Sequence, residues 1–156
     1  MTKALKKISG YQATQEHYTA DACVVWCFDA RFRAPFEQAF LRVEEINQHD
    51  LVSIAGGAKT LAMPDKECDR EYLLSQIEVS LRLHHAKAVV LMMHEDCGAC
   101  GGSEEFKKKG KVEQDELEAM LKSAKEAVIN FLKGGPHAGV PVRMVLVKFD
   151  GIYELE

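Results

Sequence analysis

The 156-residue sequence lacks the features that would point to a membrane, to nucleic acid or to secretion. Its apolar runs, such as Ala88–Met93, are far too short to cross a bilayer. Charge of one sign is not in large excess, because 20 Lys and Arg stand against 24 Asp and Glu, and this balance excludes a strongly basic surface for nucleic acid or anionic lipid. The N-terminal residues carry lysines but no apolar segment of a secretion signal, so we expect a cytoplasmic protein.

Cysteine occurs five times, and this odd number does not favour a framework of paired disulfides. Reduced thiols serve best as metal ligands or nucleophiles, so the count permits a site. Cys23 is expected in the core and Cys68 in a loop. Cys100 forms a Cys-x-x-Cys pattern with Cys97, but it is a weak candidate for a fourth metal ligand.

Hydrophobic patterning predicts an N-terminal arm over residues 1–20, followed by one domain over residues 21–156. The arm is either a frayed terminus or a segment that packs on a partner. Strands and helices alternate in the domain, with strands expected at 22–28, 51–55, 86–93 and 142–149 and helices at 36–48, 69–85 and 117–132. This order predicts an α/β fold of three layers, α-β-α, with a mainly parallel sheet of four strands in the order 2-1-3-4 and a short edge strand after them.

Side chains that can bind a metal lie where two of these strands end. Cys27 ends the first strand, and His94 and Cys97 follow the third. In parallel sheets, ligands bind beyond the carboxyl ends of strands where the winding direction reverses, so we expect the three residues to converge there. Two soft sulfurs and one imidazole nitrogen suit zinc and leave a fourth position for a carboxylate or a water. The sequence therefore predicts a zinc site.

An acidic and a basic residue follow Cys27 at alternate positions. If the segment is extended, Cys27, Asp29 and Arg31 point to the same side. The Arg31 guanidinium can then bind the Asp29 carboxylate through two hydrogen bonds, which lowers its pKa and fixes its orientation. Two roles remain open for Asp29: it is the fourth zinc ligand, or it pairs with Arg31 and orients a zinc-bound water whose pKa zinc lowers toward about 7.

These motifs resemble those of the β-class carbonic anhydrases, which carry Cys-x-Asp-x-Arg after the first strand and His-x-x-Cys after the third. Ala55–Gly57 and Asp150–Tyr153 extend the similarity. The resemblance implies zinc-dependent, reversible hydration of carbon dioxide to bicarbonate and a proton by a zinc-bound hydroxide. The ligands would be Cys27, His94 and Cys97, with Asp29 and Arg31 as the catalytic dyad. It also implies a homodimer or a dimer of dimers.

The sequence departs from the family pattern at two positions near the motifs. Ile54 stands where Asn is frequent, and Glu95 stands where Ser or Thr commonly follows the zinc histidine. Glu95 is expected to add a carboxylate close to the metal. Beside the metal we expect a small apolar substrate pocket, formed by Phe28, Phe32, Gly56, Gly57 and Gly98.

Two other functions are compatible with the same ligands. One is a related hydrolase that acts on carbon disulfide or carbonyl sulfide, because access to the pocket rather than the metal would select the substrate. The other is a non-catalytic protein in which Asp29 closes a structural zinc site permanently. Arg31 favours an openable site, because a permanently closed one has less need of it.

Overall fold

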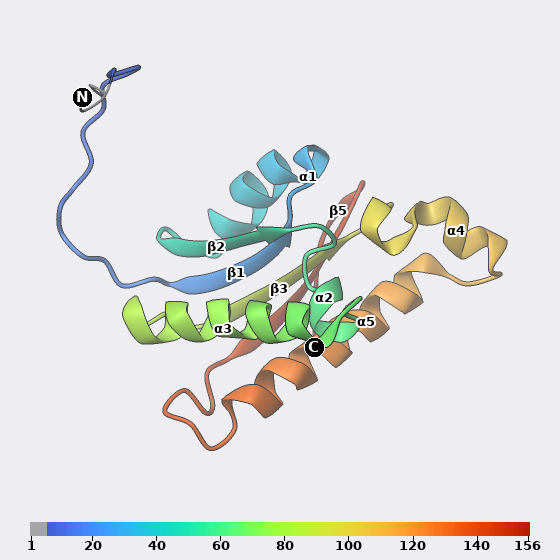
Figure 1. Ribbon diagram of the computed structural model, residues 1–156. Helices are drawn as coiled ribbons and strands as arrows, with labels where there is room; N and C mark the ends of the chain where they lie inside the picture. The colour runs from blue at the N-terminus through green and yellow to red at the C-terminus, as the bar shows by residue number, and fades with distance from the viewer. Residues whose placement is uncertain (1–5) are drawn as a thin grey trace, which may run out of the picture.

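Five strands form one sheet in the computed structural model, which describes residues 6–156 (Figure 1). The strand order is β2-β1-β3-β4-β5, in which the first four strands are parallel and β5 is antiparallel to β4. The strands are β1 (Ala22–Cys27), β2 (His49–Ile54), β3 (Val89–His94), β4 (Val142–Lys148) and β5 (Gly151–Leu155). The predicted order 2-1-3-4 with an added edge strand is confirmed.

The two central strands, β1 and β3, are buried along their whole length, because helices cover both faces of the sheet. On one face, Val89, Leu91 and Met93 share a core with α3 (Glu67–Leu83) and α5 (Glu113–Leu132). On the other face, Val90 and Met92 share a core with the aromatic side chains of α1 (Ala30–Pro35) and η1 (Phe36–Leu41). Figure 1 shows these two layers on opposite sides of the sheet. Continuous apolar runs are thus what strands covered on both faces require.

The segment after β1 differs from the expected helix over 36–48. Asp29 accepts a hydrogen bond from the backbone N–H of Arg31 and so caps a helix that begins at Ala30. The helix continues as a π-helical turn, in which the N–H of Arg42 donates to the carbonyl of Glu37 at 3.3 Å. Arg31 therefore lies in the first turn of a helix and not on an extended segment, because the Asx cap stops the strand early.

The connections near the carboxyl ends of the strands are more helical than the sequence suggests. A short helix, α2 (Lys59–Ala62), follows the turn after β2 and was not predicted. Residues 100–111, expected as a loop or a helix with a mobile end, contain the end of the 3-10 turn η2 (Gly98–Cys100) and α4 (Gly102–Lys108). α5 begins at Glu113, earlier than predicted, with an acidic first turn that favours a helix start.

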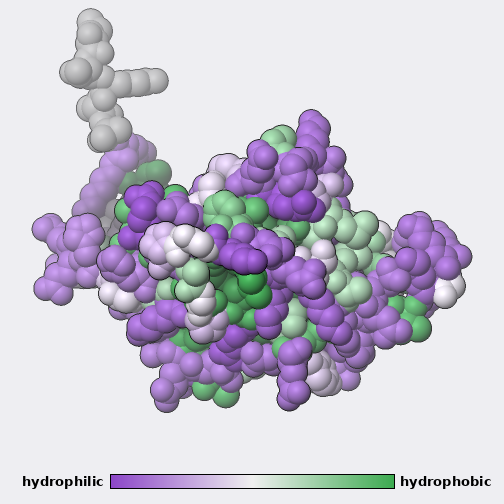
Figure 2. Space-filling view, turned by 90° about the horizontal axis from the view of Figure 1, so that it is seen from below, coloured by the Kyte–Doolittle hydropathy of each residue, from purple (hydrophilic) through white to green (hydrophobic). Residues whose placement is uncertain are grey.

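Residues 6–19 form neither helix nor strand and are exposed, and they lead into the buried Ala20. The Tyr18 hydroxyl donates to Asp50 at 2.5 Å, and its ring packs on His84 with centroids 4.4 Å apart. Figure 2 shows a mainly hydrophilic face of the molecule, interrupted by small apolar areas. The division into an arm over 1–20 and a domain over 21–156 stays a prediction, and residues 1–5 lie outside the described part.

None of the helices within residues 6–156 has the length and apolar character that a membrane span requires.

Candidate metal centre

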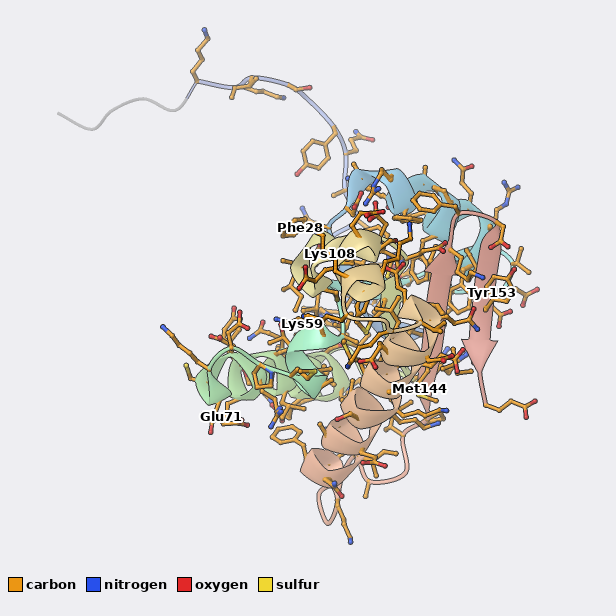
Figure 3. All side chains as sticks on the ribbon, turned by 90° about the vertical axis from the view of Figure 1, so that its right-hand side faces the viewer. Phe28, Lys59, Glu71, Lys108, Met144 and Tyr153 are labelled. Carbon is orange, nitrogen blue, oxygen red and sulfur yellow. The ribbon has the colours of Figure 1, made fainter. Side chains whose placement is uncertain are left out.

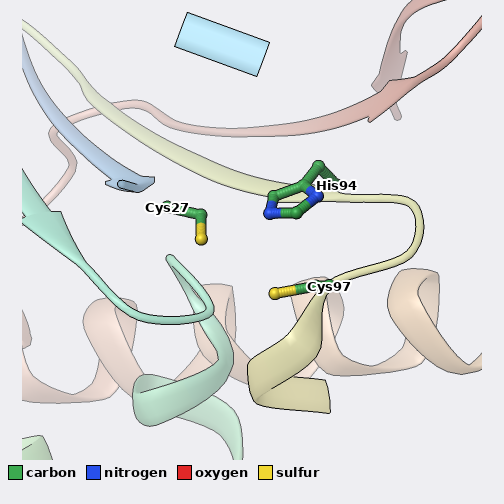
Figure 4. A group of neighbouring side chains, drawn as sticks. All are labelled: Cys27, His94 and Cys97. Carbon is green, nitrogen blue, oxygen red and sulfur yellow. The ribbon is translucent and has the colours of Figure 1, made fainter. Parts of the chain in front are cut away.

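Three side chains from adjacent strands meet at the carboxyl edge of the sheet. Cys27 ends β1, His94 ends β3, and Cys97 follows in the turn after β3. Their ligating atoms all lie within 4.8 Å of one another, and all three residues are buried (Figure 4). Because β1 pairs with β3 in parallel, both strands end at the same edge and deliver their terminal residues to one point.

The imidazole of His94 is oriented by its backbone neighbour. Its Nδ1 lies 2.8 Å from the carbonyl oxygen of Glu95, which can only accept, so Nδ1 carries the hydrogen. Nε2 is then the lone-pair nitrogen, and it is buried without a hydrogen-bond partner among the described residues. Phe32 covers the ring, with centroids 4.4 Å apart. A fixed tautomer with a free Nε2 is the arrangement of a metal-binding histidine.

The sulfur atoms complete a donor set that fits zinc. The backbone N–H of Gly56 donates to Cys27 Sγ at 3.3 Å, a contact that stabilises a thiolate. The hydrogen bond with Cys97 and then burial raise the pKa of Cys27 to about 12, so the thiol keeps its proton until a metal displaces it. The Cys100 N–H donates to the Cys97 carbonyl oxygen at 2.9 Å, but Cys100 does not belong to the three-residue cluster. Two sulfurs and one nitrogen match the ligands that zinc prefers.

A paired carboxylate lies beside the cluster. Arg31 holds Asp29 through its Nε, 3.1 Å from each carboxylate oxygen, and its Nη2, 2.7 Å from Oδ2. The hydrogen bonds from Arg31 lower the pKa of Asp29 to about 2, so the carboxylate is ionised at neutral pH. Asp29 Oδ2 lies 3.9 Å from His94 Nε2. The helix cap thus brings Asp29 and Arg31 to the cluster by a different route from the extended segment expected.

The predicted pocket residues are distributed around this edge of the sheet. Phe32 is buried against His94, whereas Phe28 is 65% exposed and is labelled in Figure 3, which looks onto this end of the molecule. Gly98 is exposed. Gly56 and Gly57 are buried in the turn after β2, where a Cβ on Gly57 would stand 2.2 Å from the carbonyl oxygen of Met92. Their contact with a substrate stays a prediction.

A groove of about 430 Å³ opens beside Arg31 and Phe32. Its other wall includes Phe149 in the β4–β5 turn and Ile152 in β5, neither of which was predicted to line the site. Their place directly after β4 could have indicated them, because β4 ends at the same edge of the sheet as β1 and β3. Glu95 is not turned to the cluster as expected, since its Oε2 accepts a hydrogen bond from the Phe149 N–H at 3.1 Å.

The fold and this cluster together define an α/β protein with a candidate metal centre at the carboxyl edge of a parallel sheet. Residues 17–132 match the family model described as "Putative carbonic anhydrase". This range is well over half of the chain, and the chain belongs to that carbonic anhydrase family. No curated protein matches the sequence.

Solved structures of carbonic anhydrases share the fold. The β-carbonic anhydrase isoform I of Trichomonas vaginalis aligns with a TM-score of 0.54 at 15% identity, covering 93% of this chain and 87% of that chain. The carbonic anhydrase of Streptococcus mutans gives a TM-score of 0.54 at 15% identity, with 94% and 88% covered. That of Glaciozyma antarctica gives 0.51 at 17% identity, with 88% and 83% covered. The resemblance read from the sequence is thereby confirmed at the level of family and fold.

Proposed function

We propose that this protein is a zinc-dependent carbonic anhydrase that interconverts carbon dioxide and bicarbonate. The observation that carries the proposal is the unpartnered Nε2 of His94, buried within 4.8 Å of two cysteine sulfurs and 3.9 Å from the ionised Asp29. Membership of the carbonic anhydrase family supports the same activity.

In this proposal Cys27, His94 and Cys97 hold the metal. A zinc ion held there would supply the positive charge that lets a water molecule lose its proton at a pH near about 7. The buried Phe32 shields the imidazole of His94 from solvent, which strengthens the electrostatic interactions in the cluster.

Asp29 orients the attacking water. Its Oδ2 is the carboxylate atom that lies near His94, and it can accept a hydrogen bond from that water. Because Arg31 keeps the pKa of Asp29 at about 2, the carboxylate stays an acceptor throughout the neutral range. A water that donates one hydrogen to Asp29 has a fixed orientation and can present an oxygen lone pair to the carbon atom of the substrate, and this orientation is the contribution we assign to Asp29.

The groove between α1 and the β4–β5 turn is the proposed approach for substrate. Carbon dioxide is small and apolar, and the groove offers Phe32, Phe149 and Ile152 beside the Arg31 guanidinium. Apolar side chains accept the neutral gas, and the guanidinium is suited to the bicarbonate oxygens.

The proposal includes a homodimer, or a dimer of dimers, in the cytoplasm. The exposed arm supports an assembly, because Ile8 and Tyr11 are almost fully accessible and are large apolar side chains. Light scattering on the purified protein tests this part, and a monomer at every concentration would contradict it.

Stopped-flow hydration of carbon dioxide by the zinc-loaded protein, across a range of pH, tests the activity. Asp29→Asn should lower kcat/KM by about 100-fold or more, the usual scale for loss of a group that handles a proton, while zinc content and melting temperature stay unchanged. Asp65→Asn is the matched control, because it also removes a carboxylate paired with a cation, but an exposed one that pairs with Lys59 and not with Arg31.

Two results would overturn the proposal. A folded, zinc-loaded protein that is inactive at every pH contradicts the activity. Loss of zinc from the Asp29→Asn variant identifies Asp29 as a permanent ligand and the centre as structural. Sulfide release from carbon disulfide or carbonyl sulfide, in a protein that leaves carbon dioxide unchanged, would favour the related hydrolase.

A further inference from the structure

We propose that Asp96 is a positioning residue that holds Arg31 in the orientation in which it pairs with Asp29 and keeps that carboxylate away from the metal position. This inference rests on the proposed metal centre and deepens it. It assigns a role to a residue between the ligands His94 and Cys97 for which the sequence offered none.

Arg31 is bound along two edges by two different carboxylates. Its Nη1 donates to Asp96 Oδ2 at 2.9 Å, and its Nη2 donates to the Asp96 carbonyl oxygen at 3.0 Å. The Nε and Nη2 atoms meanwhile donate to Asp29. All three nitrogens of the guanidinium are therefore engaged, and the planar fork has a single orientation that serves both partners.

Asp96 is itself fixed by two neighbours, Ser103 and Glu113, which also bind each other. Its Oδ1 accepts a hydrogen bond from the Ser103 N–H at 3.1 Å, at the start of α4. Its own N–H donates to Glu113 Oε1 at 2.7 Å, at the start of α5, and the Ser103 hydroxyl donates to the other oxygen of Glu113. Two helix starts thus hold the Asp96 backbone and carboxylate in place, so Asp96 can act as a rigid support for Arg31.

The backbone of Asp96 favours this residue type. Its φ is +54°, in the left-handed region that asparagine and aspartate tolerate better than other non-glycine residues. The other carboxylate of the turn, that of Glu95, is occupied by the Phe149 N–H. Asp96 is therefore the residue of this turn whose side chain supports Arg31.

The Asp96 carboxylate is needed because the ion pair between Arg31 and Asp29 is partly exposed. The Arg31 side chain is 47% exposed, and a single exposed ion pair holds its partners only weakly. If Asp96 no longer bound Arg31, the guanidinium would be free to swing toward solvent. Asp29 would then lose its competing partner and could close the short distance to the cluster, where it would act as a fourth ligand and block exchange.

Asp96→Asn is the direct test, because it keeps the shape and the left-handed backbone. An asparagine has one oxygen, which can accept from Ser103 or from Arg31 but not from both, and its amide nitrogen repels the Arg31 donor. Substituted with cobalt(II), the variant should show a visible spectrum shifted from that of the parent protein, together with weaker binding of an added azide probe. In the zinc form, kcat/KM should fall about fivefold, the upper range for an exposed charge pair.

A double variant separates positioning from a general structural effect. In Asp29→Asn/Asp96→Asn no carboxylate remains to approach the metal, so the spectrum should match that of Asp29→Asn alone. Ser103→Ala is the matched control, because it disturbs the same turn but leaves both contacts between Asp96 and Arg31. If Asp96→Asn fails to fold, Arg31→Lys takes its place, because one ammonium cannot bridge both carboxylates and should give the same shift.

The outcomes distinguish this inference from the proposed function. An unchanged spectrum and unchanged kcat/KM in Asp96→Asn, in a protein that does hydrate carbon dioxide, overturn the role of Asp96. A shift that persists in the double variant also overturns it. A parent protein that binds cobalt and shows the Asp29-dependent shift, but hydrates no carbon dioxide, overturns the activity and leaves the positioning role standing.

Discussion

The two ends of the parallel sheet each hold a carboxylate between partners from distant segments, but the partners differ in kind. At the amino end, Asp50 accepts hydrogen bonds from the Tyr18 hydroxyl and, at 2.8 Å, from His84 Nδ1. At the carboxyl end, Asp29 is bound by the permanently charged Arg31 and lies beside the unpartnered His94 Nε2. The first arrangement ties the N-terminal arm to the domain with groups that can lose a proton. The second pairs an arginine that stays protonated with a carboxylate whose pKa is lowered to about 2, so both partners are charged at neutral pH.

This difference separates a structural carboxylate from one suited to chemistry. The Asp50 carboxylate connects its own strand to the segments that carry Tyr18 and His84, and it is satisfied by the hydrogen bonds that these two residues donate. Asp29 is held by Arg31 through both of its oxygens, and its Oδ2 also lies 3.9 Å from His94 Nε2, at the edge of the cluster of Cys27, His94 and Cys97. Breaking the carboxyl end should therefore change metal binding and activity, whereas breaking the amino end should change stability alone.

The largest effect is expected at the ligands. Cys97→Ser replaces a thiolate by a hydroxyl that stays protonated at neutral pH, so bound zinc should fall from about one per chain to almost none, and the activity with it. Elemental analysis of the dialysed protein measures this. Cys68 lies in the first turn of α3 and not in the expected loop, and it is exposed, so Cys68→Ser should keep full zinc content. Full zinc retention by Cys97→Ser would remove Cys97 from the site.

A smaller effect, on stability, is expected where the turn after β2 approaches the end of β3. Gly57→Ala places a Cβ 2.2 Å from the Met92 carbonyl oxygen at a φ of +56°, and it should cost about 3 kcal/mol or more in the free energy of unfolding. Gly110→Ala is the control, because its φ is +66° but nothing lies within 4 Å, so about 1 kcal/mol is expected. Urea unfolding compares them, and equal losses would show that the close approach is unimportant.

The smallest effect belongs to the amino end and depends on pH. The hydrogen bond to Asp50, then burial and the nearby negative charge, raise the pKa of Tyr18 from 10.0 to about 12. A group whose pKa is raised on folding stabilises the fold below its unfolded pKa. This contribution is thus present below pH 10 and is lost as the pH rises through about 12.

Absorbance at about 295 nm follows phenol ionisation, and Tyr18→Phe should remove the latest step of the titration. At neutral pH the same variant should lose about 1 kcal/mol of stability, the usual scale for one hydrogen bond, with zinc content and kcat/KM unchanged. A fall in activity would show that the two ends of the sheet are coupled.

The sequence was sufficient for the strand order and for the convergence of Cys27, His94 and Cys97, because both depend on local signals. Apolar runs identify buried strands, and Cys27, His94 and Cys97 stand at strand ends that a parallel sheet must bring to one edge. The extended conformation predicted for the segment that carries Arg31 was wrong, since residue spacing alone does not reveal that Asp29 caps a helix.

The surroundings of the ligands could not be predicted for a different reason. Asp96 reaches Arg31, and Glu113 reaches Asp96, only because a left-handed turn and two helix starts meet in space. Glu95 was expected near the metal, but a tertiary contact with the Phe149 N–H turns it away. Such contacts depend on the packing of distant segments and leave no pattern along the chain.

The sharing of Arg31 between two carboxylates affects the electrostatic field that a molecule meets as it approaches the site. One guanidinium between Asp29 and Asp96 leaves one negative charge uncompensated, and this charge lies at a partly exposed rim. A neutral molecule crosses such a field without cost, whereas an anion is repelled by the excess carboxylate until it reaches the Arg31 guanidinium. The field extends over roughly 8–10 Å at physiological salt. In the proposed reaction, this rim therefore leaves the entry of the uncharged reactant unhindered.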